Sequence, residues 1–158
     1  MRKITIGFST PKKFKLGSFL IRKFEGSEYS HIFIKMNASP KSPLPFAKVF
    51  QASHGDVNAI AYDVFKKDNH IFHEYELEIE DDKYYEVATW LWFQLGKPYG
   101  FTQLLGIAFK VKMSNNKEDR FICSELAGMI LKEYLCFDIS KSLDYISLDD
   151  IKKILESR

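Results

Sequence analysis

Residues 75–82 read Tyr75-Glu76-Leu77-Glu78-Ile79-Glu80-Asp81-Asp82, and within them the hydrophobic pattern changes from that of a strand to that of a helix. Apolar and acidic residues alternate up to Ile79, which predicts a half-buried strand over 71–79. The acids Asp81 and Asp82 then favour a helix start, because negative charge stabilises a first helical turn, and this helix continues through Leu95. Strands cluster before this point and helices after it. This order predicts an α+β fold with a mostly antiparallel sheet packed against helices.

The remaining expected elements lie on either side of this change. The strands are 3–8, 30–36, 48–53 and 59–64; the helices are 13–24, 101–109, one that begins at Cys123 and one that begins at Ser147. The segments 38–45 and 113–119 are rich in proline or polar residues and predict loops. No repeat or linker divides the chain, so we expect a single domain over 1–158.

Charge is nearly balanced overall but uneven along the chain. A net charge of +2 over 158 residues is too small to indicate a nucleic-acid partner. From Met1 to Phe24, however, there are seven basic residues and no acidic one. This basic N-terminal face is either a solvated surface or a place of peripheral contact with a membrane or an anionic substrate. No apolar run is long enough for a secretory signal or a membrane span, so the sequence predicts a cytoplasmic protein.

Two cysteines differ in their surroundings. Cys123 stands where an amphipathic helix begins, and a helix N-terminus favours thiolate over thiol. It is therefore either a nucleophile or a small core residue. Cys136 is flanked by apolar residues and is expected to be buried, and the spacing of the two predicts free thiols. We accordingly expect Cys123 to alkylate faster than Cys136.

A thiol nucleophile needs a base and a polar group that orients the base. His31, on the expected strand 30–36, is the candidate base, although a strand-edge histidine without catalytic role would look the same. His54 competes with it. His70 and His73 with the adjoining Glu74 are a weak metal set, since the two histidines fall on opposite faces of a strand. Gln51 is either the orienting amide or a plain surface glutamine.

Four short segments, taken in order, resemble one known superfamily. They are 16–21, 29–34 around His31, 49–52 around Gln51, and Gly96-Lys97-Pro98-Tyr99-Gly100 followed by Phe121-Ile122-Cys123-Ser124-Glu125-Leu126. They are similar to the NlpC/P60 papain-like cysteine hydrolases in their circularly permuted branch, the YaeF/YiiX-like permuted papain-like amidases. The histidine strand precedes the nucleophile here, which is the permuted order.

This resemblance implies a papain-like fold and a cysteine hydrolase or amidase. Cys123 matches the nucleophile, His31 the base and Gln51 the third polar position, with Tyr99 and Ser124 at the substrate or oxyanion position. Gln51 replaces an acidic residue of the permuted branch, and Ile122 replaces an aspartate of the unpermuted one.

The implied substrates are peptidoglycan peptides or lipid amides and esters. No cofactor and no metal are implied, and a location reached through host lysis or a phage particle is compatible with the sequence. The competing hypothesis is a binding or structural module that keeps the fold without useful turnover.

Overall fold

The computed structural model describes residues 1–37, 47–53, 55–100 and 120–157. Its centre is a five-stranded sheet in the order β4-β3-β2-β1-β5, with every neighbouring pair antiparallel. The strands are β1 (Arg2–Pro11), β2 (His31–Met36), β3 (Lys48–Ser53), β4 (Asp56–Ala61) and β5 (Asn69–Ile79). The α+β class and the antiparallel sheet expected from the sequence are confirmed.

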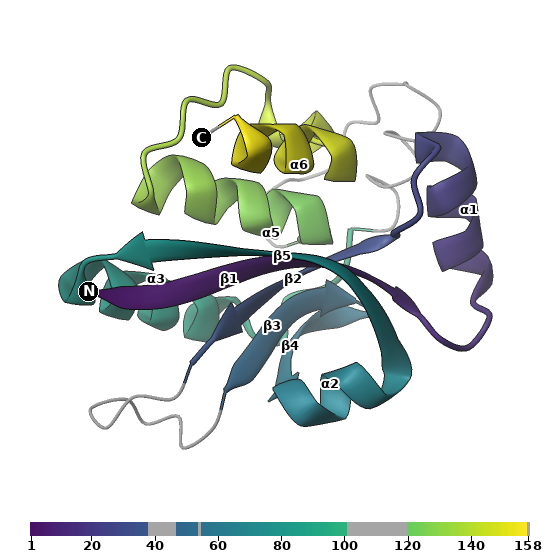
Figure 1. Cartoon of the computed structure of the whole chain (residues 1–158), viewed down its shortest axis with the longest axis horizontal. Coiled ribbons are helices and arrows are strands. Elements are labelled where there is room, and N and C mark those ends of the chain that lie inside the picture. The colour runs from purple at the N-terminus through teal and green to yellow at the C-terminus, as the bar shows by residue number, and fades with distance from the viewer. Residues whose placement is uncertain (38–46, 54, 101–119, 158) are drawn as a thin grey trace.

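The helices surround the sheet unevenly. They are α1 (Leu16–Glu25), α2 (Tyr62–Asp68), α3 (Asp81–Gln94), α5 (Cys123–Met129), the π-helical η2 (Ile130–Tyr134), the 3-10 turn η3 (Leu143–Tyr145) and α6 (Leu148–Glu156). Figure 1 shows α5 and α6 over one face of the sheet and α2 against the opposite face, while α1 stands at one end of it. Within the described residues, no helix is both long and apolar enough to cross a membrane.

Strand periodicity sorts the core into two clusters. The larger one lies under α5 and α6 and takes alternate residues of β1 and β2, such as Ile4, Ile6 and Ile32. The smaller one lies under α2, where Phe65 packs with Phe33 and Val49. Neighbouring residues of one strand therefore belong to different clusters, as the pleat requires.

Strands β2 and β3 separate at one end, and this separation creates the site. Their pairing runs only from Met36 with Lys48 to Ile34 with Phe50. Beyond it, β2 is paired with β1 alone and β3 with β4 alone. The first residues of β2 and the last residues of β3 therefore border a gap in the sheet rather than a hydrogen-bonded ladder.

Most expected elements are confirmed, and the clearest helix start is that of α6. The Ser147 side chain accepts from the N–H of Asp150, and the Asp150 carboxylate accepts in return from the N–H of Ser147. This reciprocal capping satisfies two backbone donors that a helix start would otherwise leave unpaired. The expected loops 38–45 and 113–119 and the expected helix 101–109 lie outside the described residues.

The expected strand over 59–64 is wrong in its second half. The strand β4 ends at Ala61, and α2 begins at Tyr62. Alternating apolar residues continue past this point, but burial of Phe65 against the sheet and an Asp63–Lys66 ion pair at 3.1 Å favour a helical turn. Tertiary packing overrides the local strand preference here.

The expected burial of Cys136 is also wrong, because its side chain is exposed. Cys136 has a φ of 55°, in the left-handed region, just after η2 ends. Its neighbours Leu135 and Phe137 pack against the larger core cluster. The reversal of the chain that turns both neighbours inward leaves the cysteine outside. Both cysteines are free thiols, as expected.

Candidate active site

The gap between β2 and β3 brings together two of the expected site residues. An imidazole nitrogen of His31, Nε2, lies 2.8 Å from Oε1 of Gln51. His31 is the first residue of β2 and Gln51 belongs to the part of β3 that has left β2, so their side chains bridge the separation. The expected contact between the Gln51 amide and the imidazole is confirmed.

A chain of amide hydrogen bonds fixes the direction of that contact. The amide nitrogen of Gln51 donates to Oδ1 of Asn58 at 3.1 Å, and Nδ2 of Asn58 donates to the Asp56 carboxylate at 3.2 Å. A carboxylate only accepts, so it orients the Asn58 amide, which orients the Gln51 amide in turn. Gln51 Oε1 therefore accepts a proton held on His31 Nε2. This assignment leaves Nδ1 as the acceptor atom of the neutral ring.

Sequence reasoning missed Asn58. It pairs directly with Gln51 across β3 and β4, which places the two side chains on one face. A polar residue in a strand of alternating pattern was the available signal, but the register that sets it opposite Gln51 depends on the fold.

A cleft of about 760 Å³ opens beside this network. His31, Gln51 and Tyr99 line it, and Ser18 and Ile21 of α1 form another part of its wall. Residues of β2, β3, β4 and α1 line the cleft, so the packing of these elements determines its size. A pocket of this size suits a small substrate or an acyl or peptide segment of a larger one.

Cys123 lies next to the cleft rather than on its wall. The residue is 4% exposed and, with Ser124, lines a separate cavity of about 10 Å³. Ser30 and Ile21 line both spaces, so they form the partition between them. A volume this small holds about one water molecule at most. In this conformation the thiol is therefore closed to a substrate.

The electrostatic environment of Cys123 favours the neutral thiol. Burial raises the pKa of Cys123 to about 11, and the nearby Glu25 carboxylate acts in the same direction. Backbone N–H groups of Ile32, Ser124 and Cys123 itself oppose this by stabilising the thiolate, and they lower the pKa. Desolvation is the largest effect. The expected stabilisation of the thiolate by the helix start exists but is outweighed.

The Cys123 sulfur and the His31 imidazole are both associated with the start of β2. Cys123 belongs to the larger core cluster together with Ile32, whereas the His31 ring lies 6.4 Å from the Phe65 ring on the α2 side. A nucleophile and its base must lie close together, so we predict that the Cys123 sulfur and the His31 ring approach within about 4 Å, and this stays a prediction.

Tyr99 is held between the cleft and the start of α5. Its backbone N–H donates to the carbonyl of Gly55 at 2.8 Å, and a parallel bridge pairs it with Phe121. Burial raises the pKa of Tyr99 far above its usual range, and the charge of Cys123 adds to this effect. The phenol therefore stays protonated and keeps a hydrogen to donate.

Sequence reasoning also missed Glu25, the last residue of α1. Its Oε2 accepts from the N–H of Leu148 at the start of α6, at 3.2 Å, and the residue lines the small cavity beside Cys123. Burial raises the pKa of Glu25 to about 7, and the charges of Asp149 and Asp150 add to this. Only the docking of α6 on α1 reveals this group.

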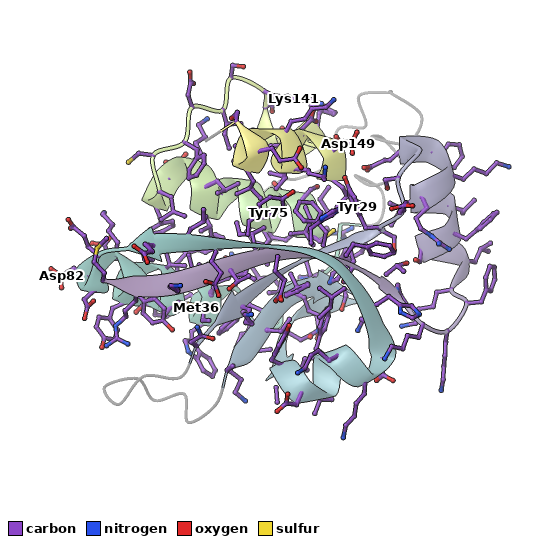
Figure 2. All side chains as sticks on the ribbon, in the orientation of Figure 1. Tyr29, Met36, Tyr75, Asp82, Lys141 and Asp149 are labelled. Carbon is purple, nitrogen blue, oxygen red and sulfur yellow. The ribbon has the colours of Figure 1, made fainter. Side chains whose placement is uncertain are left out.

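Another contact ties the same region together. The hydroxyl of Tyr29 donates to the Asp149 carboxylate at 2.8 Å, and Figure 2 shows both side chains where α6 meets the sheet. Tyr29 precedes Ser30 and His31, so this bond anchors the entry to β2 against α6. The position of His31 is thus linked to the helix that covers Cys123.

The other histidines are placed differently. His54 lies outside the described residues. The His73 ring packs edge-on against Phe8, with centroids 6.5 Å apart, and His70 is exposed. Over residues 1–37, 47–53, 55–100 and 120–157, no three His, Cys, Asp or Glu side chains are grouped as metal ligands.

The chain was compared with models of protein families and with curated proteins. No family model matches it, and no curated protein matches it either.

Proposed function

We propose that this protein is a cysteine hydrolase or acyltransferase that acts on an amide or ester bond, with a permuted NlpC/P60-like, papain-like arrangement. The observation that carries the proposal is the 2.8 Å hydrogen bond between His31 and Gln51 at the wall of a large cleft. It fixes an imidazole that carries its proton on Nε2, so Nδ1 is the nitrogen that would take a thiol proton. The backbone N–H of Ile32, the residue next to His31, acts on the Cys123 sulfur and lowers the pKa of the thiol.

The proposed reaction begins from the neutral thiol. His31 Nδ1 takes the Cys123 proton as the sulfur forms a bond to the substrate carbonyl carbon. The oxygen that becomes negative is stabilised by backbone N–H groups at the start of α5, at Cys123 and Ser124, and by the protonated Tyr99. Collapse breaks the bond to the amine or alcohol, which takes the proton from His31. Water or an acceptor alcohol then resolves the thioester.

Access to the sulfur requires a small rearrangement. Ile21 and Ser30 separate the cleft from the cavity of Cys123. His31 is the first residue of its strand and has no backbone pairing with β3, so its ring is held to β3 through the Gln51 side chain. A turn of the imidazole and a shift of the partition would join the two spaces. Apolar acyl chains and peptidoglycan peptides are the substrate classes we propose.

A second candidate function is a binding or structural module without useful turnover. The closed space around Cys123 and its pKa of about 11 favour it. Both candidates use the same cleft, so ligand binding alone does not separate them.

Acyl transfer to the thiol does separate them. The protein is incubated with p-nitrophenyl esters of increasing chain length, and the acylated cysteine is located by mass spectrometry. We expect a thioester on Cys123 and a loss of about 10²–10⁴-fold in its rate of formation in His31→Ala. Cys136→Ala and His70→Ala, which alter an exposed thiol and an exposed histidine, are the matched controls. Acylation of Cys136 alone, or of neither cysteine, would contradict the enzyme proposal.

The amide chain has its own test. In Asn58→Leu the Gln51 amide loses the acceptor that orients it, so we expect the imidazole of His31 to populate both tautomers instead of one. The measurement is the pair of ¹⁵N chemical shifts of the His31 ring. Unchanged shifts in the variant would mean that something other than this chain sets the tautomer.

A further inference from the structure

Helix α1 (Leu16–Glu25) has its apolar side turned toward water. Leu16 is 64% and Phe19 is 42% exposed, and no residue of the helix is fully buried. At 100° per residue, these two lie on one side together with the exposed Lys23. An amphipathic helix on a protein surface normally buries its apolar side. In α1, the apolar side faces water instead.

The opposite side of α1 is largely polar and is the one attached to the protein. The Ser18 hydroxyl is hydrogen-bonded to the Ser30 hydroxyl at 2.5 Å, and the Glu25 carboxylate accepts from the N–H of Leu148. Ile21 lies with them and lines the cleft. These contacts hold the helix by its polar side. The apolar side is thereby left exposed. Figure 1 shows α1 at one end of the sheet.

The turn before α1 extends the exposed apolar surface. Phe14 is 77% exposed, and its ring lies 6.0 Å from the Phe19 ring between centroids. Lys13 is exposed beside it, and Lys23 is exposed near the other end of the helix. We call Phe14, Leu16 and Phe19, with Lys13 and Lys23, the outer face of α1. Aromatic and aliphatic side chains edged by lysines are typical of helices that lie in a membrane interface.

Size and charge distinguish between possible occupants of this face. A whole apolar side chain has about 200 Å² of surface. Phe14, Leu16 and Phe19 are only 77%, 64% and 42% exposed, so together they offer well under the roughly 800 Å² that each partner gives to a stable protein interface. A bilayer has no such minimum, because its surface deforms around each inserted side chain. Lys13 and Lys23 are exposed on this face, and the segment from Met1 to Phe24 has no acidic residue. The charge of these two lysines complements anionic headgroups, whereas Arg2 and Lys3, at the other end of β1, are ion-paired with Asp81 and Glu76.

We propose that the outer face of α1 docks on a lipid bilayer that carries anionic headgroups. Phe14, Leu16 and Phe19 enter the interface, while Lys13 and Lys23 pair with headgroups. The opposite side of the same helix lines the cleft through Gly17, Ser18 and Ile21, so docking brings the cleft to the membrane. The corollary that the substrate is a lipid ester or amide rests on the proposed function; the docking itself does not.

The test is flotation of the full chain with vesicles of phosphatidylcholine alone or with phosphatidylglycerol added. We expect binding to the anionic vesicles and release by salt. Phe14→Ser with Phe19→Ser should weaken binding at least about tenfold, and Lys13→Glu with Lys23→Glu at least about fivefold for each lysine. Phe93→Ser is the matched aromatic control, since Phe93 is 76% exposed on α3, and Lys132→Glu is the charge control. Thermal unfolding checks that every variant is folded.

Each outcome decides the proposal. Binding that is lost in the α1 variants and kept in both controls supports it. No flotation of the wild type, equal flotation with neutral vesicles, or equal loss in Phe93→Ser would overturn it. A dimer that Phe14→Ser dissociates, without vesicle binding, would assign the face to a second copy instead. Cys123→Ser should float like the wild type, so failure of catalysis and failure of docking are separate results.

Discussion

Cys123 should be strongly protected from alkylation in the native protein. Burial raises its pKa from 9.0 to about 11. Each unit reduces the thiolate fraction tenfold at neutral pH, so the native rate falls about 100-fold below that of a thiol with the ordinary value. The closed cavity of about 10 Å³ slows the reagent further. Cys136 is exposed and needs no opening to react. We therefore expect Cys136 to react faster than Cys123, which is the reverse of the order expected from the sequence.

The assay is mass-spectrometric labelling of both cysteines with iodoacetamide at pH 7.5, in buffer and in urea. We expect Cys123 to label at least about 100-fold more slowly in buffer than in urea, and Cys136 to change little. In Glu25→Gln the nearby negative charge is removed, so the Cys123 pKa falls and its native rate rises. Glu28→Gln, three positions along the chain and exposed, is the control. Native labelling of Cys123 as fast as in urea, or faster than Cys136, would refute the argument from burial.

Two further predictions concern stability. A Cβ on Gly7 would lie 2.1 Å from the buried Phe33 ring, so Gly7→Ala should lower the free energy of unfolding by about 1–3 kcal/mol, measured by urea titration. A Cβ on Gly17 would meet nothing within 4 Å, so Gly17→Ala should leave the free energy of unfolding unchanged. Equal stability of the two variants would contradict this prediction. The pKa of Glu25 is raised from 4.5 to about 7 in the folded state, so folding favours the protonated carboxyl over the carboxylate. Stability should therefore be full below pH 4.5 and fall by up to about 3 kcal/mol as the pH rises to 7. Glu25→Gln should remove this fall, and parallel pH curves for variant and wild type would count against the assignment.

Much of the architecture follows from local sequence. Alternation of apolar residues specifies the strands, because successive side chains face opposite sides of a sheet. The end of α1 is set by Gly26, whose φ of 65° suits a residue without a Cβ. The start of α6 is set by the paired side chains of Ser147 and Asp150. These signals act within a few residues, so they can be read without knowing the fold.

The site was only partly predictable, because local signals do not show which distant residues come together. The segments of His31 and Gln51 could be found in the sequence, but Asn58 enters the hydrogen-bond chain only through the register of β3 and β4. The position of Cys123 at a helix start was also readable. Its burial was not, because it depends on Glu25 and other groups brought there from distant parts of the chain.

The sequence by itself determined where the strands and most helices lie, that the fold is α+β, and that His31 and Gln51 were candidates for one site. Only the tertiary structure decided how those residues are solvated. It exposed Cys136, enclosed Cys123 and turned the apolar side of α1 outward. The physical reason is that periodicity and capping are properties of neighbouring residues, whereas desolvation depends on which distant elements pack over a group. Desolvation is the largest influence on the Cys123 pKa, so the protonation state of the candidate nucleophile belongs to the fold rather than to its local sequence.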